Sequence, residues 1–355
     1  MSEIPVLAGI ESTFVDTPRL KQHVLSCGSP EATPVVLLHG NFSSALYWEE
    51  LMLALAERGF RCIAPDLRGY GWTEPKPIDG SRGYRDFVDD VAELTDALHL
   101  ERFHLVGWSL GGGMALRYLA DHPGQVTTVT LQAPGSPYGF GGTKDLAGTP
   151  CFDDFAGSGG GVVNPEFIKR IAAGDRSGDD PNSPRNVINA FYYKAPFRPA
   201  REEDFLTGAL REVTGTQYYP GDFVPSVHWP NVAPGRWGAI NASSPGNVKS
   251  DVPALLAVTP KPPILWIRGA DDQIVGDASL FDVGTLGKMG LLPGWPGDEV
   301  FPSQPMIAQT RAVLNRYLDG GGRYREVVFQ DCGHAPHIEH PDQWLETFVS
   351  HVRPD

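Results

Sequence analysis

The stretch FHLVGWSLGGGMALRYLA, residues 103–120, decides the fold of this 355-residue chain. Its first residues are typical of a buried strand and its second half of a helix, so a sharp turn must join them. At that turn Gly107, Ser109 and Gly111 form the pattern G-x-S-x-G. In a strand–turn–helix setting the glycines leave room for a serine that stands clear of the backbone at a helix N-terminus. We therefore predict that Ser109 is a nucleophile, against the simpler interpretation of a glycine-rich turn with an incidental serine.

Outward from this turn, short apolar runs alternate with amphipathic stretches. The runs have turn-rich flanks and predict strands buried in a parallel sheet. These predicted strands are 35–38, 62–64, 103–106, 126–131, 264–267 and 324–329. The amphipathic stretches predict helices at 44–58, 84–98, 110–121, 305–318 and 342–352. Such alternation predicts βαβ units, with two further extended segments, near Phe14 and at 23–26, pairing at the sheet edge.

The alternation stops between residues 135 and 261. Glycine and proline are common there, but aromatic residues are frequent enough for a small core, so the segment is not a disordered linker. Helical patterns are confined to about 164–173, 186–193 and 202–213. We interpret this segment as a large insertion into the α/β pattern.

Four more motifs stand at the ends of predicted strands or beside them. They are His39-Gly40, PDLRGYG at 65–71, GADDQIV at 269–275 and GHAP at 333–336. In this order and spacing, together with the serine turn, the chain resembles the α/β-hydrolase family of serine hydrolases, except over 135–261 and about 276–304. The resemblance implies an eight-stranded, mostly parallel sheet flanked by helices, with a lid inserted after the sixth strand. It implies a core of residues 1–134 and 262–355 and a lid of residues 135–261.

A serine is a weak nucleophile until a base takes its proton. The family pattern places this base at His334 and the carboxylate that orients it at Asp272, rather than at the adjacent Asp271, which we expect to cap or form an ion pair. The alternative acid position, at the end of the sixth strand, holds Gln132 and Ala133 and offers no carboxylate.

Backbone N–H groups are expected to stabilise the developing oxyanion. One is that of Leu110; the other belongs to the loop after His39-Gly40, with Asn41 as the first candidate and Phe42 as the second. The predicted substrate pocket contains Phe42, Trp108, Tyr192, Tyr193, Tyr218 and Tyr219. For the four tyrosines the alternative is a place in the lid's own core. The stretch of about 276–304, which follows Asp272, is expected to join the same rim.

Other site types find little support. His337 and His340 follow His334 in what we interpret as a polar loop, not a metal site, and Gly69-Tyr70-Gly71 lacks the G-x-G-x-x-G of a dinucleotide site. We predict neither a metal nor a cofactor. A formal charge of −14 argues against nucleic acid and anionic membranes as partners.

The location of the protein is predicted from what the sequence lacks. No apolar run approaches a membrane span, and the N-terminus has no signal-peptide pattern. The four scattered cysteines indicate reduced thiols, and we expect a cytoplasmic protein; its oligomeric state stays open.

The predicted reaction is hydrolysis of a carboxylic ester or lactone through an acyl-enzyme on Ser109, with a small molecule as substrate. His39-Gly40-Asn41 followed by Trp48 is similar to haloalkane dehalogenases, but those enzymes and the epoxide hydrolases use an aspartate where Ser109 stands. Alternatives with the same triad are a C–C bond hydrolase of a β-diketone-like substrate and a perhydrolase. Amide hydrolysis has less support, because no acidic group is assigned to a peptide amine. A non-catalytic ligand receptor on a hydrolase fold is the alternative of another class.

Overall fold

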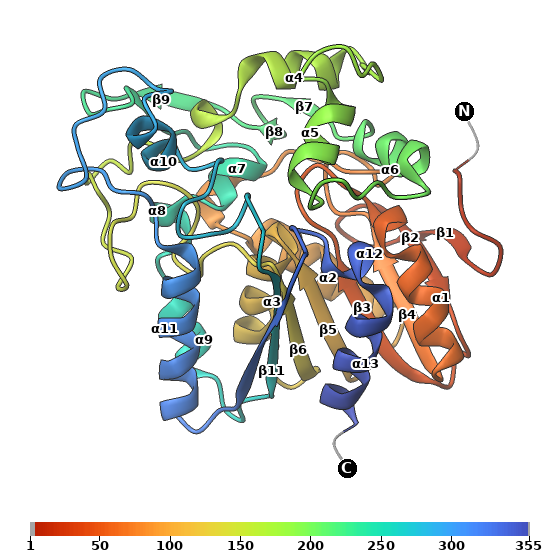
Figure 1. The fold of residues 1–355 in the computed structure, drawn as a ribbon. Helices are drawn as coiled ribbons and strands as arrows, with labels where there is room; N and C mark the ends of the chain where they lie inside the picture. Colours follow the sequence, from red (N-terminus) through yellow and green to blue (C-terminus); the bar gives the residue numbers. More distant parts are fainter. Residues whose placement is uncertain (1–3, 354–355) are drawn as a thin grey trace.

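An eight-stranded sheet forms the centre of the computed structural model, which describes residues 4–353 (Figure 1). Its strand order is β1-β2-β4-β3-β5-β6-β11-β12. The strands are β1 (Glu11–Asp16), β2 (Lys21–Cys27), β3 (Thr33–Leu38), β4 (Phe60–Pro65), β5 (Phe103–Trp108), β6 (Val126–Gln132), β11 (Ile264–Gly269) and β12 (Tyr324–Phe329). The pairs β1–β2 and β2–β4 are antiparallel and all other neighbours are parallel. The predicted eight-stranded, mostly parallel sheet is therefore confirmed, including its two edge strands.

Helices cover both faces of this sheet (Figure 1). On one face lie α1 (Glu49–Glu57) and α13 (Pro341–Val352), the latter preceded by α12 (Pro336–Glu339); on the other lie α2 (Arg85–Ala97), α3 (Leu110–Asp121), α9 (Asp251–Ala257) and α11 (Met306–Asp319). Successive strand residues point to opposite faces. In β3, Val35 and Leu37 accordingly pack in the core under α1 and α13, and Val36 and Leu38 pack under α2 and α3. Each face of the sheet thus has its own apolar core.

Most of the segment between β6 and β11 lies over the carboxyl ends of the parallel strands (Figure 1). Its helices are α4 (Pro165–Ala172), α5 (Pro184–Phe191), α6 (Glu202–Ala209), α7 (Ala239–Ala242) and α8 (Pro245–Val248), and its strands are β7 (Thr214–Gly215), β8 (Tyr219–Pro220), β9 (Phe223–Pro225) and β10 (Val232–Pro234). Asn164 and Ser183 cap α4 and α5 through their side chains, and a proline follows each cap. These signals explain why the helical patterns near 164 and 186 were visible in the sequence.

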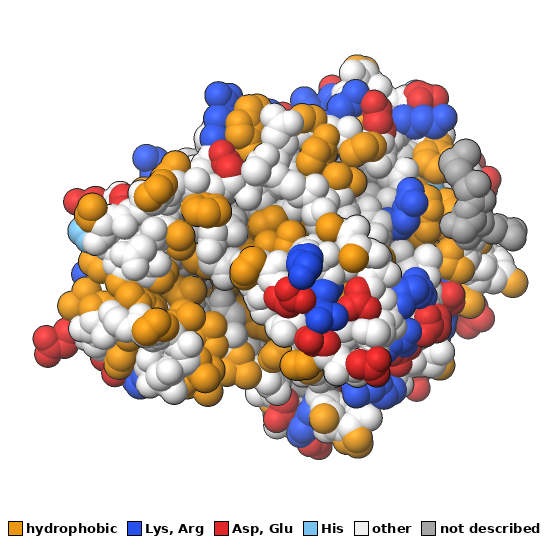
Figure 2. All heavy atoms as spheres, turned by 90° about the horizontal axis from the view of Figure 1, so that it is seen from above, with side chains coloured by type: hydrophobic (Ala, Val, Ile, Leu, Met, Phe, Trp, Pro, Cys, Tyr) orange, Lys and Arg blue, Asp and Glu red, His pale blue; other side chains and the backbone are white. Residues whose placement is uncertain are grey.

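The remaining elements are short. They are the 3₁₀-helices η1 (Ala45–Trp48), η2 (Gly80–Arg82) and η3 (Gly160–Val162), and the helix α10 (Val283–Lys288). Seen from above, hydrophobic side chains gather over the region of β9 and α10 (Figure 2), where Phe223, Val224, Met289 and Leu291 are exposed. No helix within the described residues is long and apolar enough to cross a lipid bilayer.

The helix α9 lies where the sequence predicted lid. It packs against α3 and α11 on one face of the sheet, and its Val252 and Leu255 are buried in the core of that face. A short amphipathic helix of seven residues gives too few turns for its period to be recognised in the sequence. We propose that the insertion ends near residue 250, so that α9 belongs to the core rather than to the lid.

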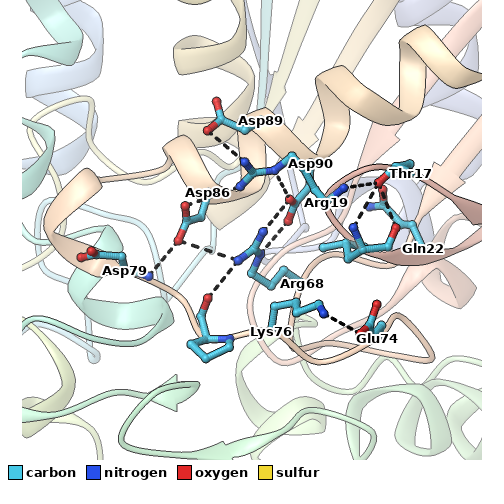
Figure 3. Close-up of polar contacts among 12 residues, drawn as sticks. Thr17, Arg19, Gln22, Arg68, Glu74, Lys76, Asp79, Asp86, Asp89 and Asp90 are labelled. Atoms are coloured by element: carbon cyan, nitrogen blue, oxygen red, sulfur yellow. Dashed lines mark hydrogen bonds and ion pairs between the residues drawn. The ribbon is translucent and has the colours of Figure 1, made fainter.

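The turn after β4 is joined to α2 by buried ion pairs (Figure 3). Arg68 donates from Nε and Nη2 to both carboxylate oxygens of Asp90, at 2.7 and 2.6 Å, and from Nη1 to the Pro77 carbonyl at 2.9 Å. Arg19 donates to the same Asp90 from the other side, at 2.6 Å. The Asp90 side chain is 1% exposed, so these donors compensate a charge that water cannot reach. The PDLRGYG motif is thus a structural turn.

We expect Arg68→Met to lower the free energy of unfolding by about 3 kcal/mol, because it leaves Asp90 buried with only one cationic partner. Arg82→Met is the matched control: Arg82 pairs with Asp86 and Asp89, but its side chain is 42% exposed. That change should cost about 1 kcal/mol or less. Urea unfolding measures both. Equal losses for the two variants would show that the Arg68 pair is no stronger than a surface pair.

Candidate active site

The serine turn has the strained geometry that its motif predicts. Ser109 follows β5 directly and precedes α3, with φ 55° and ψ −116°. A side chain at Gly107 would overlap the Gly111 carbonyl oxygen, and one at Gly111 would come within 2.6 Å of the His39 carbonyl oxygen. A residue with positive φ and a β-carbon costs free energy, which the surrounding packing must offset. The two glycines therefore allow the close backbone packing that holds Ser109 in this conformation.

The loop after β3 packs directly on this turn. A β-carbon at Gly40 would lie 2.9 Å from the Ser109 β-carbon. His39 holds the loop from within: its Nδ1–H donates to the Gly40 carbonyl at 2.8 Å, and its Nε2 accepts from the Leu67 N–H at 3.0 Å. Burial lowers the pKa of His39, which fits a neutral ring with one donor and one acceptor. His39 is therefore a structural residue beside the serine.

Three backbone N–H groups lie close to Ser109. The N–H groups of Asn41 and Phe42 have no hydrogen-bond acceptor within residues 4–353. The N–H group of Leu110 lies in the first turn of α3, where the helix has no carbonyl that could accept from it. All three residues line the same cavity as Ser109. Phe42 has φ 44°, a second strained position in the same region. The loop thus offers unpaired N–H donors beside the serine, at the two residues that the sequence analysis named as candidates.

His334 and Asp272 are brought together from two loops at the carboxyl edge of the sheet. His334 Nδ1 lies 2.8 Å from Asp272 Oδ2, and both side chains are nearly fully buried. Asp272 Oδ1 accepts from the N–H groups of Ile274 and Val275, at 2.8 and 3.0 Å. Because the Asp272 carboxylate can only accept a hydrogen bond, we place the proton of the neutral His334 ring on Nδ1, which leaves Nε2 free to accept a proton. His334 also lines the cavity that Ser109 lines, although no hydrogen bond joins these two described side chains.

The neighbouring aspartate has different contacts. Asp271 is 41% exposed and pairs with Lys194 Nζ at 3.0 Å. A water-exposed carboxylate of this kind does not reach His334, whereas Asp272 does. Of the two adjacent candidates, the geometry therefore brings only Asp272 to the histidine.

The other histidines of this loop have partners of their own. His337 is buried between Gln132, whose Nε2 lies 2.7 Å from Nδ1, and the Tyr47 carbonyl, 3.1 Å from Nε2. Burial lowers the pKa of His337 to about 3. His340 contacts the Asp331 carbonyl. Among the described residues, no group of three or more histidine, cysteine, aspartate or glutamate side chains is arranged to hold a metal ion.

A cavity of about 470 Å³ contains Ser109 and His334 in its wall. Its wall comes from the sheet edge, the insertion and the segment after Asp272. Apolar wall residues are Phe42, Leu110, Phe140, Val162, Val163, Phe167, Val187, Phe191, Ile240, Ile274, Val275, Leu280, Phe281 and Leu286; polar ones include Asn41, Asn164, Asn182, Ser243, Tyr84, Tyr192 and Tyr219. None of the described residues in this wall is a lysine, arginine, aspartate or glutamate. The cavity suits an uncharged, mainly apolar molecule.

Comparisons with known proteins agree with this architecture. The family model described as alpha/beta hydrolase fold matches residues 33–151. A solved structure of a serine hydrolase from Cycloclasticus zankles aligns over 98% of this chain and all of its own, with a TM-score of 0.61 and 17% identity. The chain is an α/β-hydrolase-fold protein.

Curated relatives match this chain over parts of their length. Epoxide hydrolase 2 of Siraitia grosvenorii is 38% identical over 118 residues, which are 33% of this chain and 36% of that protein. The 2-hydroxymuconate semialdehyde hydrolase of a Pseudomonas species is 28% identical over 199 residues, 54% of this chain and 66% of the relative. The chain thus spans between about a third and two thirds of the length of these relatives.

The predicted pocket residues of this chain divide into two groups. Phe42, Tyr192 and Tyr219 line the cavity, whereas the structure does not bring Trp108, Tyr193 and Tyr218 into its wall. The side chains of neighbouring residues point in different directions. The angle between them is about 100° in a helix and about 180° in extended backbone. This difference in direction is why Tyr192 and Tyr219 line the cavity while their neighbours Tyr193 and Tyr218 do not.

Two of the excluded rings have other packing partners. The Trp108 ring is buried among Tyr47, Trp48 and His337, and its Nε1–H donates to the His334 carbonyl at 2.8 Å. Tyr193 packs on Phe197. Trp108 therefore supports the histidine loop from beneath instead of contacting a ligand.

Sequence reasoning did not identify most of the apolar wall. Val162 and Val163 lie at the end of η3, Phe167 lies in α4, and Leu280, Phe281 and Leu286 come from the stretch after Asp272. For the last group a signal existed, because that stretch was expected to join the rim. Val162 and Val163 have no period that marks a wall residue, and the helical pattern around Phe167 does not show which surface its apolar face meets.

A buried acid lies behind the Asn41 loop. Glu212 is 5% exposed and lies beside Tyr70, whose hydroxyl donates to Asn41 Oδ1 at 2.9 Å. Neither carboxyl oxygen of Glu212 accepts a well-formed hydrogen bond within the part of the chain that the structure describes. Burial raises the pKa of Glu212 well above its ordinary value. The folded protein thus holds this carboxyl in its neutral form to a higher pH than the unfolded chain does.

This raised pKa predicts a pH-dependent effect of Glu212→Gln. Above about pH 4.3 Glu212 ionises in the unfolded chain, which lowers the free energy of that chain, whereas in the folded protein it stays protonated to a higher pH. The free energy of unfolding of the wild type therefore falls, relative to that of the variant, as the pH rises. The difference should grow with pH by up to about 1.4 kcal/mol for each unit, until the folded-state pKa is passed. Urea unfolding between pH 5 and 9 measures it. The exposed Glu57, changed to Gln, should give no such trend. A difference independent of pH for Glu212→Gln would mean that the folded protein ionises this carboxyl normally.

Proposed function

We propose that this α/β hydrolase cleaves neutral, largely apolar carboxylic esters or lactones through an acyl-enzyme on Ser109. The observation that carries the proposal is the buried Asp272–His334 pair, 2.8 Å apart, in a loop that lines the same cavity as the strained Ser109. A base oriented by a carboxylate next to a serine is the arrangement that acyl transfer needs.

Each residue has one role in the proposed mechanism. His334 Nε2 takes the proton of the Ser109 hydroxyl as Oγ attacks the substrate carbonyl, and Asp272 stabilises the imidazolium through Nδ1–H. The N–H groups of Leu110 and of Asn41 or Phe42 donate to the oxyanion of the tetrahedral intermediate. When the C–O bond breaks, the leaving oxygen takes the proton from His334. Water then attacks the acyl-enzyme with the same base, which releases the carboxylic acid and restores Ser109.

The uncharged wall supports a neutral substrate. An ionised group moved from water into this cavity would lose its hydration, and none of the described wall residues is an Arg or Lys that could pair with a carboxylate. The Pseudomonas relative is named for 2-hydroxymuconate semialdehyde, a molecule that bears a carboxylate. The wall therefore favours ester or lactone hydrolysis over C–C cleavage of such an anionic substrate. C–C cleavage of a neutral β-diketone-like substrate is the second candidate, because it needs the same three side chains.

We expect Ser109→Ala to lower kcat on p-nitrophenyl butyrate by about 10³-fold or more, because the nucleophile is lost while the fold is kept. A fluorophosphonate should add its mass to Ser109 in the wild type and to no residue in the variant. Peptide mass spectrometry and steady-state kinetics measure the two effects. Labelling elsewhere, or turnover near the wild-type level without Ser109, would contradict the proposed nucleophile.

The same assay separates the candidate reactions when the substrates are matched in size. A neutral aryl ester should be turned over faster than its carboxylate-bearing analogue, and a lactone and a neutral diketone complete the set. Faster turnover of the diketone than of any ester or lactone would favour the second candidate. Faster turnover of the anionic analogue would contradict the neutral substrate class.

The two adjacent aspartates provide a matched pair of variants. We expect Asp272→Asn to lower kcat by about 10²- to 10⁴-fold, because an amide can donate to Nδ1 and favour the wrong tautomer of His334. Asp271→Asn removes only an exposed pair with Lys194 and should change kcat less than about twofold. Ester kinetics on both variants decide the assignment, which would be reversed if Asp271→Asn were the damaging change.

A further inference from the structure

Tyr192 lies at the end of α5, in the insertion, and reaches the loops that surround Ser109. Its ring is 6% exposed and packs edge-on against Trp108, with 5.5 Å between ring centroids, and against His334, at 6.0 Å. Its hydroxyl and its main-chain carbonyl both make hydrogen bonds to these loops. A single residue of the insertion thus joins parts of the site that come from three different strand ends.

The hydroxyl of Tyr192 contacts the oxyanion loop. It lies 2.7 Å from the Asn41 carbonyl oxygen and 3.0 Å from the Phe42 carbonyl oxygen, and it is the only donor in these two contacts. A peptide unit is planar, with its C=O and N–H pointing in opposite directions. Holding the Asn41 carbonyl therefore sets the direction of the Phe42 N–H, which points away from Tyr192.

The main-chain carbonyl of Tyr192 contacts the histidine loop. It accepts from the N–H groups of His334 and Ala335, each at 3.0 Å. The adjacent Lys194 N–H donates to Glu339 Oε2 at 2.7 Å, and Glu339 Oε1 accepts from the Gly333 N–H at 2.8 Å. The backbone of residues 192–194 is therefore bound to the loop that carries His334 by hydrogen bonds that do not involve the hydroxyl.

We propose that Tyr192 is a positioning residue, whose hydroxyl holds the Asn41 and Phe42 carbonyl groups so that the Phe42 N–H faces the oxyanion. This inference rests on the proposed function. Tyr192 does not take part in proton transfer; it acts through the loop. The strained φ of 44° at Phe42 explains the need for such a contact, because without a donor at its carbonyl the loop could relax to a more favourable backbone conformation.

The loop has support on its other side as well. The Tyr70 hydroxyl donates to the Asn41 side chain at 2.9 Å, so it holds Asn41 without contacting either carbonyl. The two tyrosines thus hold different parts of the loop, since Tyr70 binds the side chain and Tyr192 binds the peptides. Of these two tyrosine contacts, only that of Tyr192 bears directly on the direction of an N–H group, which is that of Phe42. The Asn41 N–H belongs to the peptide whose Gly40 carbonyl accepts from His39.

Tyr192→Phe tests the proposal, because it removes one hydroxyl and keeps the ring and the main-chain contacts. We expect kcat on a neutral ester to fall by about 10- to 100-fold with KM changed less than about twofold, since the oxyanion exists only in the transition state. The affinity for a trifluoromethyl ketone, whose adduct with Ser109 carries the same oxyanion, should fall by a similar factor. Thermal unfolding establishes that the variant is folded.

Tyr193→Phe is the matched control. Tyr193 is the next residue, is 2% exposed, and its hydroxyl has no hydrogen-bond partner among residues 4–353. This variant loses the same atom from an equally buried ring without touching the loop, so kcat and inhibitor affinity should stay within about twofold of the wild type.

The outcomes separate this inference from the proposed function. If a fluorophosphonate labels Ser109 and the wild type turns over esters, but Tyr192→Phe keeps wild-type kcat and inhibitor affinity, the positioning role is overturned and the proposed function stands. If the wild type is neither labelled nor active, the proposed function fails, and this inference fails with it. Equal losses in Tyr192→Phe and Tyr193→Phe would also overturn the positioning role, because they would reflect packing alone.

Discussion

The close backbone contact between the Ser109 turn and the two neighbouring strand ends is the constraint on which the rest of the site depends. Glycines at 40, 107 and 111 have no β-carbon. At Gly40 and Gly111 a β-carbon would lie 2.9 Å or less from an atom across the contact between the serine turn and the loop after β3, and at Gly107 it would overlap the Gly111 carbonyl oxygen of the serine turn itself. Ser109 keeps its strained backbone conformation, with positive φ, only while this packing is intact, because a conformation with negative φ would be lower in free energy. The position of the serine, of the unpaired N–H groups beside it and of the cavity wall all follow from that contact.

The insertion takes part in the site and does more than cover it. Its residues 192–194 are hydrogen-bonded to the loop of His334, and the hydroxyl of Tyr192 reaches the loop of Asn41. Several of its apolar side chains form the cavity wall together with the stretch after Asp272. Changes in the insertion can therefore alter both which molecules fit and how well the loops around Ser109 are held.

Charge is distributed unevenly in this acidic protein. Its ion pairs lie at the surface or in structural positions such as the buried Arg68–Asp90 pair, whereas the described wall of the cavity holds no acidic or basic side chain other than His334. Glu212, the acid behind the Asn41 loop, has a raised pKa because it is buried. A neutral acid there adds no negative charge near the place where an oxyanion would form. The electrostatics of the site thus agree with a neutral substrate whose charge develops only during the reaction.

Most strands and helices of the core and the serine turn could be predicted from the sequence, and the family resemblance selected Asp272 and His334 as acid and base. These features depend on short windows: an apolar run, a helical period, a capping residue followed by proline, or glycines around a turn. Only the packed structure shows that Trp108, Tyr193 and Tyr218 lie outside the cavity, that α9 packs on the core, and that Tyr192 joins three loops. It also brings Asp272, the aspartate that the family resemblance had selected, to His334. The physical reason is that these outcomes depend on the direction of single side chains in irregular segments. No repeating pattern sets that direction, and it is decided only when distant parts of the chain pack together.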